Sequence, residues 1–121
     1  EPEKAFELGQ KILPTMGLGR DVTAIYATSD TTAIGLMRAA YGIGLSIPAD
    51  VSIVGYDDID MAAYTIPPLT TVSQTGVEMG RSAARLLFRM LTEETSGSEV
   101  SDVVLAPQLV VRESTARVVE D

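Results

Sequence analysis

The chain has 121 residues, 45% of them hydrophobic, which is enough for one soluble domain with a single core. It contains no cysteine and no histidine, which excludes disulfides and thiolate metal sites and removes the commonest general base. A formal net charge of -8 makes its surface repel phosphate backbones, so we do not expect the chain to bind nucleic acid by itself.

The chain is predicted to begin with a helix that is followed by a strand. Pro2 suits a helix start, and apolar residues keep a helical period until Pro14 stops it. The first helix is therefore expected over about residues 2–13. Residues 22–27 are rich in β-forming side chains and nearly all apolar, which predicts a buried strand.

A second helix and a second strand are predicted next. Ser29 or Asp30 can accept a hydrogen bond from the free amides of a new helix, which should end near Gly42. A strand at about 51–55 then completes a strand–helix–strand unit, which is parallel and right-handed in nearly all folds. The residues that follow the two strands should therefore lie side by side at one edge of the sheet.

The second half is predicted to hold loops, one helix and short extended segments. Pro67 and Pro68 push their predecessors out of helical geometry, so residues 59–68 are expected to form a loop. Apolar positions repeat at helical spacing over residues 77–91 and predict a helix. Residues 92–101 are polar and contain glycine, which is typical of a loop. A short extended segment is expected at 70–72, and two strands split by Pro107 are expected at 103–105 and 109–112.

Several short motifs of the chain resemble a known family. They are Ala27-Thr-Ser-Asp30, Gly44-Leu-Ser-Ile-Pro-Ala-Asp50, Val51-Ser-Ile-Val-Gly-Tyr-Asp-Asp58, Ile66-Pro-Pro-Leu-Thr-Thr-Val72 and Leu109-Val-Val-Arg-Glu-Ser114. Together they resemble the effector-binding region of LacI/GalR transcription regulators, over about residues 23–117. The resemblance implies an α/β fold with a mainly parallel sheet and flanking helices, of the periplasmic-binding-protein-like type I, comprising most of one lobe and an orphaned part of the other.

The resemblance also implies how the chain divides between the two lobes. Residues 1–69 correspond to the carboxyl-side lobe, 70–108 to a segment of the other lobe, and 109–121 to a return crossing and tail. The sheet that covers the middle segment in the family is missing, so we expect this segment to fold back, to pair with another chain or to exchange between protomers. Because the chain starts at Glu1, we expect a piece of a longer protein. Apolar side chains expected to be uncovered are Val77, Leu87, Phe88, Val103 and Leu105.

The resemblance implies ligand-binding residues at the ends of the strands. Tyr56 and Asp57 match positions where the cleft receives a small ligand, and a carboxylate can accept two bonds from sugar or ribose hydroxyls at once. Ser29 stands where relatives often carry an asparagine that reaches the ligand, and Asp30 beside it is expected mainly to cap the helix. Gln74 matches a position that often bridges to the ligand. All five residues are counted as ligand-binding. A purely structural role stays open for each: Asp57 as a turn cap, Gln74 as an exposed loop amide.

Surfaces that pair protomers in the family correspond to residues 31–42 and to the loop around Met61. On the first of these surfaces, the stripe Ile34, Met37 and Tyr41 has a helical spacing that favours the core over a partner surface. An exposed cluster of Met61, Tyr64 and Ile66 would favour the interface. The interface residues expected on these two surfaces are Ile34, Met37, Met61, Tyr64 and Thr65.

The three aspartates of the acidic loop suggest a metal site or a reactive site as alternatives to ligand binding. Asp57, Asp58 and Asp60 lack the spacing of a calcium loop, and we expect neither a metal nor a cofactor. A phospho-acceptor pocket of the response-regulator type would need a lysine downstream, and no lysine follows Lys11. Without histidine or cysteine, few activated groups remain, so we do not expect an enzyme.

The sequence thus predicts the effector-sensing and dimerisation part of a LacI-type transcriptional regulator. The ligand would be a small sugar-like or nucleoside-like effector, the partner a second copy of the chain, and the location the cytoplasm without membrane contact. Operator DNA would be bound only through a helix-turn-helix that this chain does not contain. The alternative is a periplasmic sugar-binding protein of a transport system. The residues that precede Glu1 would distinguish the two.

Overall fold

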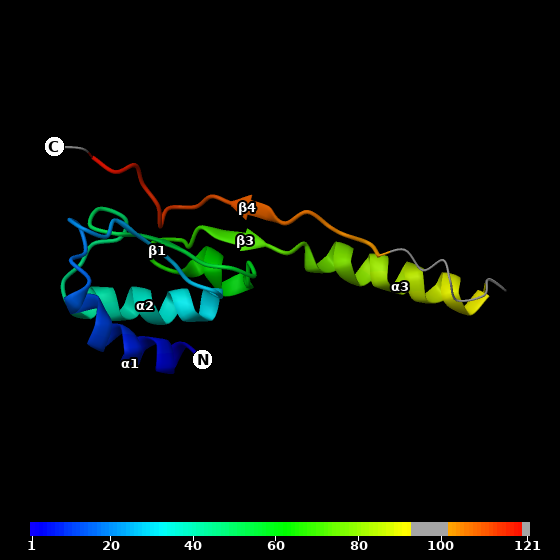
Figure 1. The fold of residues 1–121 in the computed structure, drawn as a ribbon, viewed down its shortest axis with the longest axis horizontal. Helices are drawn as coiled ribbons and strands as arrows, with labels where there is room; N and C mark the ends of the chain where they lie inside the picture. Colours follow the sequence, from blue (N-terminus) through cyan, green and yellow to red (C-terminus); the bar gives the residue numbers. More distant parts are fainter. Residues whose placement is uncertain (93–101, 120–121) are drawn as a thin grey trace.

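The structure is a computed structural model that describes residues 1–92 and 102–119. Helices, 3-10 helices and short strands alternate along it, and Figure 1 shows their arrangement. In chain order they are α1 (Pro2–Ile12), η1 (Leu13–Thr15), β1 (Ala24–Tyr26), α2 (Asp30–Gly42), β2 (Ser52–Val54), η2 (Asp60–Tyr64), β3 (Thr71–Ser73), α3 (Gly76–Thr92) and β4 (Gln108–Val110).

The start of α2 is fixed by a side-chain cap. The Ser29 hydroxyl oxygen accepts a hydrogen bond from the backbone N–H of Thr32 at 3.2 Å, which satisfies one of the free amides of the first turn. Asp30 is the first residue of the helix, and its carboxylate does not serve the helix amides. The expectation that Asp30 mainly caps the helix was therefore wrong, because its side chain turns into the protein.

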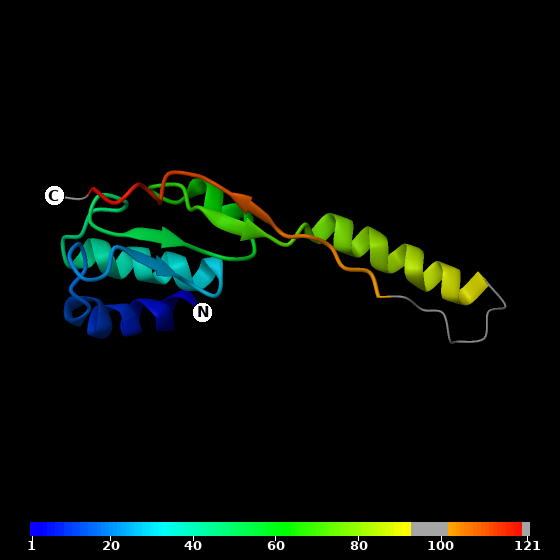
Figure 2. The same ribbon diagram turned by 45° about the horizontal axis from the view of Figure 1, so that its top comes forward.

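Helices α1 and α2 pack against each other through very small residues. A Cβ atom on Gly35 would lie 2.3 Å from the carbonyl oxygen of Pro2 and 2.7 Å from the Cβ of Ala5. A Cβ on Gly9 would lie 2.7 Å from the Cβ of Ala39. The two backbones therefore approach closely only because glycine stands at both contacts, and Figure 2 shows α1 as an outer layer on α2.

The strands form two pairs that single bridges connect. β1 and β2 are parallel, with Ile25 opposite Ile53, which confirms the predicted strand–helix–strand unit. Parallel bridges from Val54 to Thr70 and from Asp57 to Ser73 join β2 to β3, and β3 pairs with β4 in the antiparallel sense. The spatial order is thus β1, β2, β3 and β4, with the predicted mainly parallel direction.

The core lies between α2 and the sheet. Ile53, Leu69 and Ala33 are fully buried there. β1 was predicted to be buried, and this was wrong: Ile25 packs against the core, whereas Tyr26 is 60% exposed. Successive strand residues point to opposite faces, and no described segment covers the outer face at Tyr26.

The second half of the chain leaves this body. Figures 1 and 2 both show α3 projecting away from the layered part, and no α3 residue is buried. Val77 is 78% and Phe88 66% exposed, and Leu87 and Val103 are also exposed, which confirms the predicted uncovered surface at these positions. Leu105 is instead half-buried, because residues 102–105 fold back along α3 and line a groove with Met79, Ser82, Ala83 and Leu86.

Two local predictions about this half need correction. Residues 103–105 are extended but form no strand, since they have no ladder partner among the described residues. The loop expected at 59–68 contains the 3-10 helix η2, and only residue 59 and residues 65–68 of it are irregular. The helix predicted over 77–91 and the extended segments at 70–72 and 109–112 are confirmed within a residue or two. The loop predicted at 92–101 lies outside the described residues, except for Thr92.

Candidate functional site

The predicted ligand-binding residues follow three neighbouring strands at one edge of the sheet. Ser29 and Asp30 come after β1, Tyr56 and Asp57 after β2, and Gln74 after β3. Backbone hydrogen bonds tie these segments together: the N–H of Asp30 donates to the carbonyl of Tyr56 at 2.8 Å, and the N–H of Asp57 donates to a β3 carbonyl at 2.9 Å. The prediction that the residues after the first two strands share an edge is confirmed, and the structure adds Gln74 to it.

Asp57 stands in an unusual backbone conformation. Its φ is 114°, and that of the next residue, Asp58, is 56°. Residues other than glycine rarely adopt positive φ, and each such residue costs about 1–3 kcal/mol unless its surroundings hold it. Strain of this kind is concentrated at binding and catalytic sites. The loop is therefore held in a shape that its own residues would not adopt freely.

Asp57 and Gln74 meet in front of this edge. Gln74 Nε2 donates a hydrogen bond to Asp57 Oδ1 at 2.7 Å, across an interval of 17 residues. The Asp57 side chain is exposed and Gln74 is half-exposed, so both can be reached from solvent. A carboxylate acceptor and an amide donor thus stand side by side, and hydroxyl groups of a ligand can bond to both.

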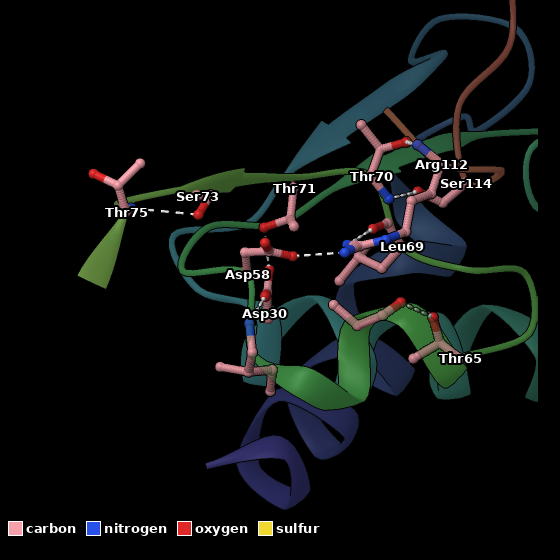
Figure 3. A network of polar contacts seen from close by, with 12 residues as sticks. Asp30, Asp58, Thr65, Leu69, Thr70, Thr71, Ser73, Thr75, Arg112 and Ser114 are labelled. Atoms are coloured by element: carbon pink, nitrogen blue, oxygen red, sulfur yellow. Dashed lines mark hydrogen bonds and ion pairs between the residues drawn. The ribbon is translucent and has the colours of Figure 1, made fainter. Parts of the chain in front are cut away.

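Asp30 lies behind this pair and is fully buried. The hydroxyl of Thr71 donates to Asp30 Oδ1, and the backbone N–H of Ile59 donates to Oδ2 at 2.9 Å, as the close-up in Figure 3 shows. A Cβ atom on Gly55 would lie 2.2 Å from Oδ1, so only glycine leaves room for the carboxylate. This geometry corrects the expectation that Asp30 contacts a ligand, because both of its oxygens are engaged and none of its surface is exposed.

Ser29 and Tyr56 flank the site in different ways. The Ser29 hydroxyl lies 3.0 Å from the hydroxyls of Thr31 and Thr32 while it caps α2. It is half-buried, so its bonding capacity is largely used within the first turn of the helix. Tyr56 is also half-buried, and its carbonyl receives the Asp30 amide.

Sequence reasoning missed the role of Arg112. Its Nη2 donates to Asp58 Oδ1 at 2.7 Å, its Nη1 donates to the carbonyl of Leu69 at 2.9 Å, and its backbone N–H donates to Thr70 Oγ1 at 2.9 Å (Figure 3). The signal was present in the Leu109-Val-Val-Arg-Glu-Ser114 motif, but the motif does not say what the arginine reaches. The partner lies 54 residues earlier in the chain.

Ser114 in the same motif is a second missed residue. It is fully buried, donates to the carbonyl of Ile53 at 2.6 Å and accepts from the N–H of Thr70 at 2.8 Å. The hydroxyl therefore joins β2 to the start of β3, and Figure 3 shows its contact with Thr70. It fixes the framework of the site and is not part of its surface.

The acidic residues of the loop do not converge. Asp58 pairs with Arg112 and Asp57 with Gln74, while Asp60 begins η2. Within residues 1–92 and 102–119, no group of three or more acidic side chains is arranged to hold a metal ion. In that same part of the chain, no helix is long and apolar enough to cross a membrane.

The predicted interface residues separate into two groups. Met37 is 3% exposed and belongs to the core, so it has no surface to offer a second chain, and the expectation for Met37 needs correction. Ile34 is half-buried, and Thr65 is half-buried with its hydroxyl donating to the carbonyl of Pro67 at 2.8 Å. The remaining apolar side chains around η2 are exposed and are called the η2 patch: Met61 at 56%, Tyr64 at 79% and Ile66 at 82%.

Known proteins resemble the chain over most of its length. Residues 3–115 match the periplasmic binding protein-like domain family. The HTH-type transcriptional regulator MalR of Streptomyces coelicolor is 48% identical over 101 residues, which cover 82% of this chain and 28% of that protein. The chain therefore spans less than a third of this curated relative's length.

Solved structures give the same picture. A LacI family transcriptional regulator from Arthrobacter sp. FB24, in complex with lactose, is 33% identical with a TM-score of 0.85 and covers 95% of this chain and 41% of its own. The lac repressor dimer bound to operator and the anti-inducer ONPF is 30% identical with a TM-score of 0.83, covering 97% of this chain and 39% of its own.

Proposed function

The chain belongs to the periplasmic binding protein-like domain family and to the LacI family of transcriptional regulators, and we propose that it senses a small sugar effector where β1, β2 and β3 end. The observation that carries the proposal is the contact between Asp57 and Gln74. It brings an exposed carboxylate and an amide from two distant segments to the predicted edge. The lactose complex of the Arthrobacter regulator supports the choice of a sugar.

The chemistry of the pair suits a sugar. Asp57 accepts hydrogen bonds from two neighbouring hydroxyls, and bonds to a charged acceptor are about twice as strong as neutral ones. Gln74 donates to a ring or hydroxyl oxygen from the other side. Tyr56 supplies a half-buried aromatic residue next to Asp57, and Ser29 contributes the edge of a hydroxyl cluster. Asp30 acts indirectly, as the buried support of the loop.

The pair also has the right position for a sensor. Asp57 belongs to the layered body, whereas Gln74 immediately precedes α3, which extends away from that body. We propose that residues 1–69 belong to one lobe, 70–108 to the other, and 109–121 to a return crossing and tail. A ligand held by both Asp57 and Gln74 then favours one arrangement of the lobes, and its differential affinity shifts the population.

The partners follow from the family. We propose that two copies of the chain pair through the η2 patch and that operator DNA is bound by a helix-turn-helix outside residues 1–121, in the cytoplasm. The dimeric lac repressor bound to operator supports both partners. A transport function is not favoured, because the relatives described above are transcriptional regulators.

The proposal is tested by thermal unfolding of the full-length protein with a panel of sugars and nucleosides that includes lactose. A ligand at about 100 times its Kd adds about 2.7 kcal/mol to the unfolding free energy, which raises Tm by several degrees. We expect a sugar to raise Tm of the wild type and of Asp60→Ala, a matched change in the same loop, but not of Asp57→Ala. An equal rise in Asp57→Ala would contradict the site.

A further inference from the structure

The loop that carries Asp57, residues 56–60, is anchored by an ion pair that the sequence did not reveal. We propose that the pair between Asp58 and Arg112 positions Asp57 for the ligand, which makes Arg112 a positioning residue of the effector site. The inference rests on the proposed function, since it assigns a role within the same site. Three observations carry it: the burial of the pair, the strain next to it and the segments that it joins.

The pair is shielded from water. The side chains of Arg112 and Asp58 are 20% and 24% exposed, at a distance of 2.7 Å. The pair of Lys4 with Glu1, by comparison, is 80% and 73% exposed. Exposed pairs contribute little to stability, whereas a charge-assisted bond that is largely withdrawn from water holds its partners firmly. Arg112 therefore fixes the orientation of Asp58.

The fixed orientation of Asp58 helps to keep the strained backbone of the loop in place. Positive φ at Asp57 and Asp58 persists only when contacts on both sides oppose relaxation. On one side, the N–H of Asp57 donates to the carbonyl of Val72 at 2.9 Å. On the other side, Arg112 holds the Asp58 carboxylate. If the second contact is lost, the peptide between the two aspartates can rotate, and the Asp57 carboxylate then moves away from Gln74.

Arg112 also joins segments that the proposed lobes share. It follows β4 on the return crossing, and it holds the carbonyl of Leu69 just before β3, the outward crossing. From the return crossing, the guanidinium therefore contacts the effector loop at Asp58 and the residue that leads into β3, Leu69 (Figure 3). A shift of the crossings would reach Asp57 through Arg112, so the residue is placed to couple lobe position to ligand affinity.

The test uses hydrogen exchange of the full-length protein without ligand. Asp58→Gly removes the carboxylate and keeps the turn, because glycine accepts φ of 56° without strain. We expect amide exchange at Asp57 and Ile59 to rise roughly tenfold in Asp58→Gly and in Arg112→Met, and exchange at Ile53 to stay unchanged. Arg112→Met should add little in the Asp58→Gly background, because the shared contact is already lost.

A second variant and a control keep the test decisive. Asp58→Asn, whose side chain also tolerates positive φ, should loosen the loop less than glycine does. Arg81→Met breaks the exposed pair with Glu78 and should leave the loop unchanged. The inference would be overturned if amide exchange at Asp57 and Ile59 in Asp58→Gly stayed at the wild-type rate. It would also be overturned if the effects of Asp58→Gly and Arg112→Met added in full in the double variant.

A titration with lactose separates this inference from the proposed function. If the wild type binds lactose, Asp58→Gly should weaken binding roughly tenfold while Tm without ligand changes little. An unchanged Kd together with a loosened loop would overturn the positioning role. If the wild type binds no sugar, the proposed function fails, and the exchange experiment still decides whether Arg112 holds the loop.

Discussion

Asp30 offers the sharpest prediction about stability. The Asp30→Asn variant keeps the shape of the side chain and replaces one oxygen with an NH2 group, which cannot accept a hydrogen bond. In the folded protein, one oxygen accepts from Thr71 and the other from the N–H of Ile59, and Asp30 and Thr71 are fully buried. One of the two donors therefore loses its acceptor, whichever way the amide is turned.

The magnitude follows from these contacts. A hydrogen bond to a charged group contributes about 1.5–3 kcal/mol, and a buried donor left without an acceptor costs about 1–3 kcal/mol. We expect Asp30→Asn to reduce the unfolding free energy by roughly 2–4 kcal/mol, a large part of the about 5–15 kcal/mol of a typical domain. Asp30→Ala removes both acceptors and should cost more, roughly 3–6 kcal/mol.

Urea unfolding followed by circular dichroism measures this cost, and a double-mutant cycle tests its cause. Thr71→Val alone removes one partner of the carboxylate and should cost roughly 1.5–3 kcal/mol. In the Asp30→Ala background, the same change should cost under about 0.5 kcal/mol, because the bond is already absent. A loss below about 0.5 kcal/mol for Asp30→Asn, or full additivity in the cycle, would refute the buried network.

Three further predictions concern packing, capping and association. Gly55→Ala places a Cβ 2.2 Å from a buried carboxylate oxygen and should reduce the unfolding free energy, measured with urea, by about 1–3 kcal/mol. The control Gly80→Ala adds a Cβ that meets open space on α3 and should be neutral or stabilising. Ser29→Ala should reduce the unfolding free energy by about 1 kcal/mol in the same assay, whereas Ser29→Asn should keep the cap. Equal losses of unfolding free energy in the two variants would contradict the assigned cap. Tyr64→Asp in the η2 patch should shift sedimentation of the full-length protein from dimer to monomer, and Leu8→Asp on α1 should not; two unchanged dimers would exclude this patch as the interface.

The elements with local signals could be predicted from the sequence. Each of the helices α1, α2 and α3 has a signal within a short stretch of sequence. The signals are Pro2 for α1, the Ser29 cap for α2 and the helical period before Thr92 for α3. The parallel unit follows from a topological rule that holds for nearly all folds. The same rule brings Ser29, Tyr56 and Asp57 to one edge.

The network behind the site could not be predicted, because its partners are far apart in the chain. Asp30 and Thr71 are 41 residues apart, and Asp58 and Arg112 are 54 residues apart. The sequence alone does not distinguish whether an aspartate after a strand is a helix cap, a ligand contact or a buried hydrogen-bond acceptor, because this depends on the neighbouring strands. Position in the motif alone therefore made Asp30 a helix cap next to the ligand and gave Arg112 no role.

Burial was also misjudged where it depends on a neighbour. Tyr26 lies in an apolar run that is typical of a strand covered on both faces, yet the described chain covers only one face there. Residues 103–105 have strand-like composition without a strand beside them. A sequence pattern shows that a segment is able to form a strand, but whether it does so depends on a neighbouring strand that the pattern does not reveal.

The central claim, that ligand binding at Asp57 is linked to operator binding, is tested most directly by measuring both affinities in the full-length protein. Linkage requires that the factor by which a sugar changes operator affinity equals the factor by which operator changes sugar affinity. We predict equal factors of roughly 5–150 in the wild type and no change of operator affinity by the sugar in Asp57→Ala. A sugar that binds the wild type with the same Kd in the presence and absence of operator would contradict the account.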